Sequence, residues 1–203
     1  MLIINESLYI AKGTHRCCYI HPHDDNLCIK IPLNKQGKQS KNIQKALNRE
    51  HKYYKRLSSR NISWKHLSEY KGDIDTNLGK GSIYQLIKDD NGLVSKSLEY
   101  YLQNPSLIKD YEENFVKQLD CLYEYMSSNK ILTTSLLPRN IAVQKTDCHL
   151  KLWIIDDIGN SEFIPISEVT SRLIRKKIKR KWNEMVELIN THYPNTLKVE
   201  VKP

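Results

Sequence analysis

The spacing of apolar and polar residues changes near the middle of the chain. The first part favours short strands rich in Ile, Tyr and Cys, together with one segment whose apolar residues recur with the period of a helix. The expected strands are Leu8–Lys12, Arg16–Ile20, Cys28–Leu33, Tyr70–Thr76 and Ser82–Ile87, and the expected helix is Ser40–Ser58. Glu50 falls on the apolar stripe of that helix, where a carboxylate needs a partner.

Helical periodicity dominates after the turn at Asp89–Gly92. The expected elements are a short helix Ser97–Gln103, a long amphipathic helix Ser106–Ser128 with Ser106 as its N-cap, a hairpin formed by Ile141–Gln144 and Leu150–Ile155, and a last helix Ser171–Asn190. This order predicts an α+β fold in two lobes. Residues 1–87 would form a small β-rich N-lobe with one helix near 40–58, and residues 88–203 a mostly helical C-lobe.

Composition places few limits on this picture. With 203 residues, 39% of them hydrophobic, the chain is long enough for one ordinary domain or two small lobes. No stretch approaches the roughly 18 apolar residues of a transmembrane helix, and the start of the chain lacks the basic segment of a signal peptide, so we expect a cytoplasmic protein. The five cysteines include no CxxC pair, which favours reduced thiols.

The chain carries a net charge of +9, and much of the excess lies in Arg172–Lys181 of the last helix. Such a charge indicates an acidic partner, for example a nucleotide, a nucleic acid or an anionic membrane. The cations on the polar faces of that helix are Arg172, Arg175, Lys176, Lys177, Lys179, Arg180 and Lys181. They either form a solvated surface or bind an acidic regulatory partner; nucleic acid is the less favoured partner because no RNA-binding signature accompanies them.

Two short motifs carry the most specific chemistry. LLPRN ends at Asn140, and an apolar strand is followed by Asp156, Asp157, Ile158 and Gly159. An amide oxygen and a carboxylate at the end of a strand are hard ligands suited to Mg²⁺. Strand alternation leaves open whether Asp156 or Asp157 points toward the site.

The first part of the chain supplies candidate phosphate contacts. Lys30 interrupts an apolar strand, and Glu50 lies 20 positions further on the inward face of the next helix. A lysine that touches phosphate needs a carboxylate to hold it, although a lysine in a strand is often an edge residue that faces water. Gly13 stands in the turn before Arg16; this turn either contacts phosphate or is an ordinary hairpin.

Lys30, Glu50, Asn140 and the Asp-Ile-Gly segment occur in the order typical of the protein-kinase-like fold. The chain also resembles the YrbL family, the PhoP-regulatory-network proteins of bacteria, through GTHRCCYIHP, CIKI, REHKYY, the pattern in Thr133–Ile141, and DDIGNSEFIP. The resemblance implies a compact bilobal kinase-like fold with a truncated C-lobe that binds ATP and Mg²⁺. It implies that Asn140 and Asp157 hold the metal, that Lys30 contacts phosphate, and that Glu50 orients Lys30.

The resemblance also has a defined departure from kinases. Ser135 stands where a kinase has its catalytic Asp, and a serine hydroxyl is no base near neutral pH without a partner. His149 or His15 would replace the base only if the fold brought them there. The sequence has no APE-type motif and only about 44 residues after Gly159, which argues against a conventional protein kinase. We therefore expect a pseudokinase or an atypical phosphotransferase; the alternative is a non-catalytic regulatory module that binds through its basic helix.

Overall fold

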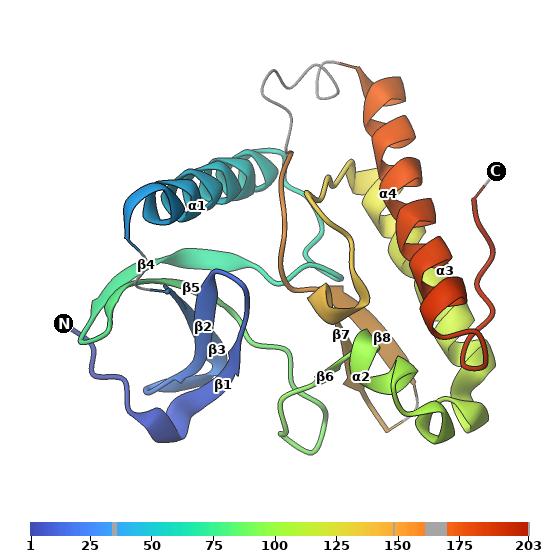
Figure 1. Ribbon diagram of the computed structural model, residues 1–203, viewed down its shortest axis with the longest axis horizontal. Coiled ribbons are helices and arrows are strands. Elements are labelled where there is room, and N and C mark those ends of the chain that lie inside the picture. The colour runs from blue at the N-terminus through green and yellow to red at the C-terminus, as the bar shows by residue number, and fades with distance from the viewer. Residues whose placement is uncertain (34–35, 148, 161–169, 203) are drawn as a thin grey trace. The chain divides into compact units, whose positions relative to one another are not determined.

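The computed structural model describes residues 1–33, 36–147, 149–160 and 170–202 (Figure 1). The fold is α+β, as the sequence predicted, with antiparallel strands and four α-helices among the described residues. The chain forms two compact units. The first unit comprises Met1–Arg56 and Ser68–Ile87, and the second comprises Leu57–Leu67 and Lys88–Pro203.

The first unit is built on a five-stranded antiparallel sheet in the order β1-β2-β3-β5-β4. Its strands are β1 (Tyr9–Lys12), β2 (Arg16–His21), β3 (Asp24–Pro32), β4 (Tyr70–Thr76) and β5 (Gly79–Gln85), and its helix is α1 (Gly37–Ser59); a 3₁₀ turn, Glu6–Leu8, precedes β1. The strands begin and end within a few residues of the predicted positions, because the alternation that marks them also decides which side chains are buried.

One face of this sheet carries an apolar core. Ile29 and Ile31 of β3 are buried there with Ile4, and Leu2, Tyr19, Ile74 and Ile83 pack against them. Gly81 of β5 lies directly over this cluster: a Cβ at Gly81 would be 2.5 Å from Cγ2 of Ile29. The close packing of β5 on β3 therefore requires glycine at this position.

The opposite face carries polar side chains together with α1. Because strand residues alternate, Lys30, whose cross-strand partners are Cys18 and Ser82, lies on the face opposite to Ile29 and Ile31. Glu50 of α1 contacts this same face. The apolar stripe of α1 is buried as its period predicted, and it consists of Ile43, Leu47, Tyr54 and Leu57.

The second unit combines a small sheet with three helices. Its elements are β6 (Lys96–Ser97), α2 (Leu98–Leu102), α3 (Glu112–Asn129), β7 (Ile141–Lys145), β8 (Leu150–Ile154) and α4 (Ser171–His192), with 3₁₀ turns at Pro105–Leu107, Lys109–Tyr111 and Pro138–Asn140. The sheet order is β6-β7-β8. Helices α3 and α4 run side by side (Figure 1), and the rings of Tyr123 and Trp182 meet between them at 5.2 Å. No helix in the described ranges is long and apolar enough to span a membrane.

The start of the long helix differs from the prediction. The apolar spacing predicted a helix from Ser106, with Ser106 as N-cap, but α3 begins at Glu112 after two 3₁₀ turns. Pro105 occupies the first position of the first turn, so Ser106 lies inside a turn and caps nothing. Ile108 is fully buried from a non-helical position, which is why it continued the helical pattern.

Candidate functional site

The sequence-predicted residues fall into two groups, one in each unit. Gly13, Arg16, Lys30 and Glu50 belong to the first unit, whereas Ser135, Asn140, Asp156 and Asp157 belong to the second.

Glu50 is held by an ion pair with Arg16. The guanidinium of Arg16 approaches the carboxylate through both terminal nitrogens, with Nη2–Oε2 at 3.1 Å and Nη1–Oε1 at 3.2 Å, and both side chains are 10% exposed. The Tyr84 hydroxyl donates to Oε1 of Glu50 at 2.6 Å. A planar guanidinium fits both oxygens of a carboxylate, which a lysine ammonium does not. The structure thus pairs Arg16 with Glu50; its predicted contact with phosphate stays a prediction.

Lys30 joins the same group through the Tyr84 ring. Lys30 is buried, and its Nζ lies 4.8 Å from the centroid of that ring, the geometry of a cation–π contact. Burial, and next the charge of Glu50, raise the pKa of Tyr84, so its hydroxyl stays protonated. We call Arg16, Lys30, Glu50 and Tyr84 the Tyr84 cluster. Three of these four residues were candidate site residues from the sequence. Nothing in the sequence indicated Tyr84, because its position depends on the pairing of β3 with β5.

Gly13 lies in an exposed turn between β1 and β2. Its N–H donates to the Arg16 carbonyl at 2.8 Å. A Cβ at Gly13 would meet that same carbonyl oxygen at 3.6 Å, an ordinary van der Waals distance. The local geometry of this turn therefore does not require glycine.

In the second unit, Asn140 and Asp157 lie in direct contact. Asn140 immediately precedes β7, and Asp157 closely follows β8; the pairing of Ile141 with Ile154 brings these ends together. The Asn140 side-chain amide donates to Oδ2 of Asp157 at 2.8 Å. Two residues that are 17 positions apart in the sequence thus present an amide and a carboxylate at the same end of one hairpin.

The backbone distinguishes Asp157 from its neighbour Asp156. Asp157 has a left-handed conformation with φ at +59°, which Asp tolerates better than most residues. Its N–H is bonded to Oδ1 of Asp156 at 3.0 Å, and its carbonyl accepts from the Thr134 N–H at 2.8 Å. The carboxylate beside Asn140 is that of Asp157, and the Asp156 carboxylate contacts the backbone.

Of the two histidines named as a substitute base, only His149 is in the same unit as Asn140 and Asp157, and it does not lie beside them. His149 stands at the opposite end of the β7–β8 hairpin, bonded to Thr146. The five residues of β8 separate these ends by roughly 15 Å. His15 belongs to the first unit. Ser135 is half-buried in the loop before Asn140.

Lys177, whose predicted position was wrong, connects α4 with the end of the Asp-Ile-Gly segment. Lys177 was predicted on the exposed basic surface, but it is 5% exposed and its ammonium donates to the buried side chain of Asn160. Asn160 directly follows Gly159 of the Asp-Ile-Gly segment. Lys177 lies three positions after Ile174 and one before Ile178. Helix residues at this spacing share a face, so the apolar stripe itself predicts that Lys177 points inward.

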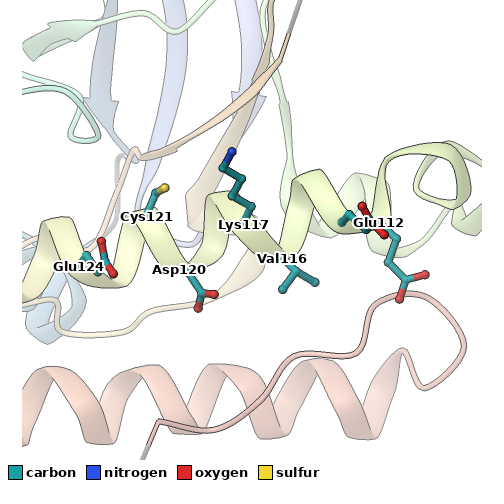
Figure 2. Close-up of a pocket in the computed structure, with 7 residues that line it drawn as sticks. Glu112, Val116, Lys117, Asp120, Cys121 and Glu124 are labelled. Carbon is teal, nitrogen blue, oxygen red and sulfur yellow. The ribbon is translucent and has the colours of Figure 1, made fainter.

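A cavity of about 730 Å³ lies elsewhere in the second unit, along α3 (Figure 2). Its lining is acidic, with four carboxylates and one lysine, and consists of Glu112, Glu113, Val116, Lys117, Asp120, Cys121 and Glu124. The ammonium of Lys202 contacts Asp120. None of the predicted site residues lines this cavity.

Known proteins resemble the chain over nearly its whole length. The sequence profile of the family described as PhoP regulatory network protein YrbL matches residues 2–190. The chain belongs to the YrbL family. The uncharacterized protein YrbL of Escherichia coli (strain K12) is 30% identical to it over 189 residues, which cover 92% of this chain and 87% of the relative. The YrbL protein of Shigella flexneri gives the same values. The match to the YrbL family includes residues of both units and both predicted groups.

Proposed function

We propose that this YrbL-type protein is a kinase-like nucleotide-binding protein, either a pseudokinase or an atypical phosphotransferase, that acts in the PhoP regulatory network. The observation that carries the proposal is the contact between Asn140 and Asp157 at the paired ends of β7 and β8. The contact is made by the Asn140 amide nitrogen, and the oxygen of the same amide together with the Asp157 carboxylate would supply hard ligands. Such ligands suit Mg²⁺, which binds through one or two carboxylates and takes its other ligands from water and phosphate.

In this proposal the second unit holds the metal. The Asp157 carboxylate and the Asn140 amide oxygen are the protein ligands, and Asp156 positions the backbone of Asp157. Among the described residues, no group of three or more His, Cys, Asp or Glu side chains is placed to hold an ion. With two protein ligands, the site would bind Mg²⁺ weakly by itself. It would bind Mg²⁺ more tightly with ATP, because the phosphates add oxygen ligands and the metal neutralises part of the phosphate charge.

Within the first unit, the candidate phosphate contact is the Tyr84 cluster. Lys30 carries the charge for the phosphates, and Glu50 orients it indirectly, through the Tyr84 hydroxyl and ring. Arg16 neutralises Glu50, so the net charge of the Tyr84 cluster is positive. A positive cluster whose members already contact one another is suited to an anionic phosphate.

Ser135 decides between the two forms of the proposal. A missing general base lowers the rate of transfer by about 10²–10⁴, while positioning and metal electrostatics supply most of the catalysis of phosphoryl transfer. A pseudokinase binds ATP without turnover, and an atypical phosphotransferase transfers slowly or to an acceptor that needs no strong base.

Thermal unfolding with and without Mg-ATP tests the binding. Asp157→Asn is the informative variant, because Asn has the same size and tolerates the left-handed backbone at this position. Asp156→Asn is the matched control, since it retains the Oδ1 acceptor for the Asp157 N–H. We expect Mg-ATP at about 100 times its Kd to stabilise the wild type and Asp156→Asn by about 2.7 kcal/mol, with loss of the shift in Asp157→Asn and after removal of Mg²⁺.

Two results would change the proposal. A wild-type protein that shows no shift at millimolar ATP with Mg²⁺ contradicts nucleotide binding. A shift that survives in Asp157→Asn but disappears in Asp156→Asn assigns the metal to Asp156 instead.

One observation favours the second candidate, a binding module for an acidic partner. Cations recur every three or four residues along the first half of α4, and all but the half-buried Lys179 are exposed. We call them the basic stripe; they are Arg172, Arg175, Lys176, Lys179 and Arg180. Within the described residues, Arg180 pairs with Glu184 at 3.6 Å, and no carboxylate is paired with the other four. The C-terminal segment lies along the second half of α4 through Asn183 and Lys202, which leaves the basic stripe exposed.

Salt dependence tests this second candidate. We expect binding to an RNA or to anionic vesicles to weaken with salt, with a slope that falls when Arg175, Lys176 and Lys179 are changed to Gln. A control with the same change of charge replaces Lys41, Lys45 and Lys52 on the exposed side of α1. Equal slopes for the two triple variants would contradict a role for the basic stripe.

A further inference from the structure

Two cysteines lie side by side on the polar face of the sheet in the first unit. Cys18 of β2 is opposite Lys30, and Cys28 of β3 is opposite Ile20. Because residues two apart share a face, Cys18 and Cys28 are diagonal neighbours on adjacent strands. Cys17 is opposite Ile31 and lies on the other face.

The two thiols are in contact but differ in their exposure. They share a side-chain hydrogen bond, and this bond and then burial raise the pKa of Cys28 well above its ordinary value. Cys28 is 4% exposed, whereas Cys18 is half-buried and reaches the surface. A reagent from solution therefore meets Cys18 first, with the protonated thiol of Cys28 directly behind it.

The surroundings of Cys18 are electropositive. Lys30 is its cross-strand partner, and Arg16 extends from the same face of β2. The charges of Lys30 and Arg16 act on the neighbouring Cys28 in the direction that favours a thiolate, although burial outweighs them there. A partly exposed cysteine beside such cations is the setting in which thiolates form and react.

We propose that Cys18 and Cys28 are a redox-modification site, in which a hydroperoxide converts the two thiols into a reversible disulfide. In the first step the Cys18 thiolate attacks the peroxide, the O–O bond breaks, and Cys18 becomes a sulfenic acid while the departing hydroxide takes a proton. In the second step the Cys28 sulfur loses its proton and attacks the sulfenic sulfur. The S–O bond breaks and water leaves.

Atoms and electrons balance over these two reaction steps. The two thiols lose two hydrogens and two electrons, and hydrogen peroxide is reduced to two waters.

Diagonal neighbours on a sheet have Cα atoms about 7–8 Å apart, while a disulfide needs at most about 6.8 Å. Because paired strands are already about 4.8 Å apart, closing the bridge requires a small local shift of β2 along β3. A bridge under strain is readily reduced again by thiols.

The other described cysteines are not placed for this reaction. Cys17 shares a hydrogen bond with Tyr19 on the opposite face of β2. Cys121 is in the second unit, on α3.

The test uses the full-length reduced protein treated with limiting hydrogen peroxide, alkylated, and analysed by mass spectrometry. We expect the intact mass to fall by two hydrogens before alkylation, and three of the five cysteines to remain open to alkylation. Trypsin leaves Cys17, Cys18 and Cys28 in one peptide, residues 17–30. Cleavage before Asp24 or Asp25 separates them and shows which pair is linked.

Single variants assign the roles. We expect Cys17→Ser to form the bridge as the wild type does, and Cys18→Ser to lose it. In Cys28→Ser the bridge is lost and a sulfenic acid accumulates on Cys18, where dimedone traps it. Dithiothreitol should restore all five thiols in the wild type.

The proposal is wrong if peroxide links a different pair of cysteines, or if it oxidises Cys18 directly to sulfinic acid with Cys28 unchanged. Circular dichroism of Cys18→Ser checks its fold; if that variant is unfolded, Cys28→Ser with dimedone still decides, because an unlabelled Cys18 contradicts the first step. None of these readouts depends on nucleotide binding.

Discussion

At the scale of single residues, the ion pair between Arg16 and Glu50 makes the most testable contribution to stability. Both side chains are 10% exposed, and removing the Glu50 carboxylate takes the counter-charge away from the buried guanidinium of Arg16. We expect Glu50→Ala to lower the free energy of unfolding by about 3–5 kcal/mol, measured by urea denaturation followed by circular dichroism. Glu50→Gln should lose less, because it retains an acceptor for the Tyr84 hydroxyl.

A surface pair of the same sheet is the matched control. Lys71 and Glu69 are 2.5 Å apart, but their side chains are 43% and 30% exposed. Glu69→Ala should therefore change stability by no more than about 1 kcal/mol. Equal losses in Glu50→Ala and Glu69→Ala would show that burial of the Arg16–Glu50 pair has no special effect.

Residue types and spacing predicted several of these positions but few of their partners. The inward position of Glu50 followed from the helical period alone, and it is buried. That Arg16 and Tyr84 bind Glu50 depends on strand register, because a shift of one residue turns every side chain to the other face. Asn140 and Asp157 were predicted from motifs, and their contact depends on the pairing of Ile141 with Ile154.

At the scale of elements, the packing of β5 on β3 depends on Gly81. A Cβ at this position would lie 2.5 Å from Cγ2 of Ile29 and 3.3 Å from Cγ1 of Ile31, and both isoleucines are buried. We expect Gly81→Ala to destabilise the protein by about 1–3 kcal/mol through overpacking, seen as a lower midpoint in urea.

Gly13→Ala serves as the control for Gly81→Ala. A Cβ at Gly13 would touch only a carbonyl oxygen at an ordinary distance, so its effect should stay within about 0.5 kcal/mol. A larger loss for Gly13→Ala than for Gly81→Ala would contradict this account of the sheet.

The elements themselves were more predictable than their ends. Period two marked the strands, and period 3.6 marked α1 and α4, because each period follows directly from backbone geometry. The start of α3 was not predictable from the period, since Ile108 and Tyr111 continue the helical spacing through two 3₁₀ turns. Side-chain spacing reports which residues face the core and not how the backbone brings them there.

At the scale of the whole molecule, half-buried histidines in both units predict a dependence of stability on pH. His51 of the first unit stacks on Tyr70 and lies 3.8 Å from Asp73. Burial lowers the pKa of His51, although the charges of Asp73 and Glu50 act in the opposite direction. His66 of the second unit donates from Nδ1 to the Leu152 carbonyl at 2.7 Å, and burial lowers its pKa as well.

The sign follows from linkage. Both histidines have a lower pKa in the folded protein than the value of about 6.5 in the unfolded chain, so below neutrality the unfolded chain binds more protons. Their contribution is complete above about pH 6.5 and is lost as the pH falls toward the folded pKa values. The free energy of unfolding should therefore decrease between pH 7.5 and 5.5, by at most about 1.4 kcal/mol per pH unit for each histidine.

Urea denaturation at several pH values measures this dependence. His51→Gln and His66→Gln should each show a flatter profile than the wild type, because each removes one group that takes up a proton on unfolding. His15→Gln is the control, since His15 is exposed in the turn before β2. Because the contacts of His51 with Tyr70 and Asp73 and the contact of His66 with Leu152 share no residue, their effects should add in the double variant. A wild-type profile that rises toward pH 5.5 would show that both histidines are stabilised in their protonated form.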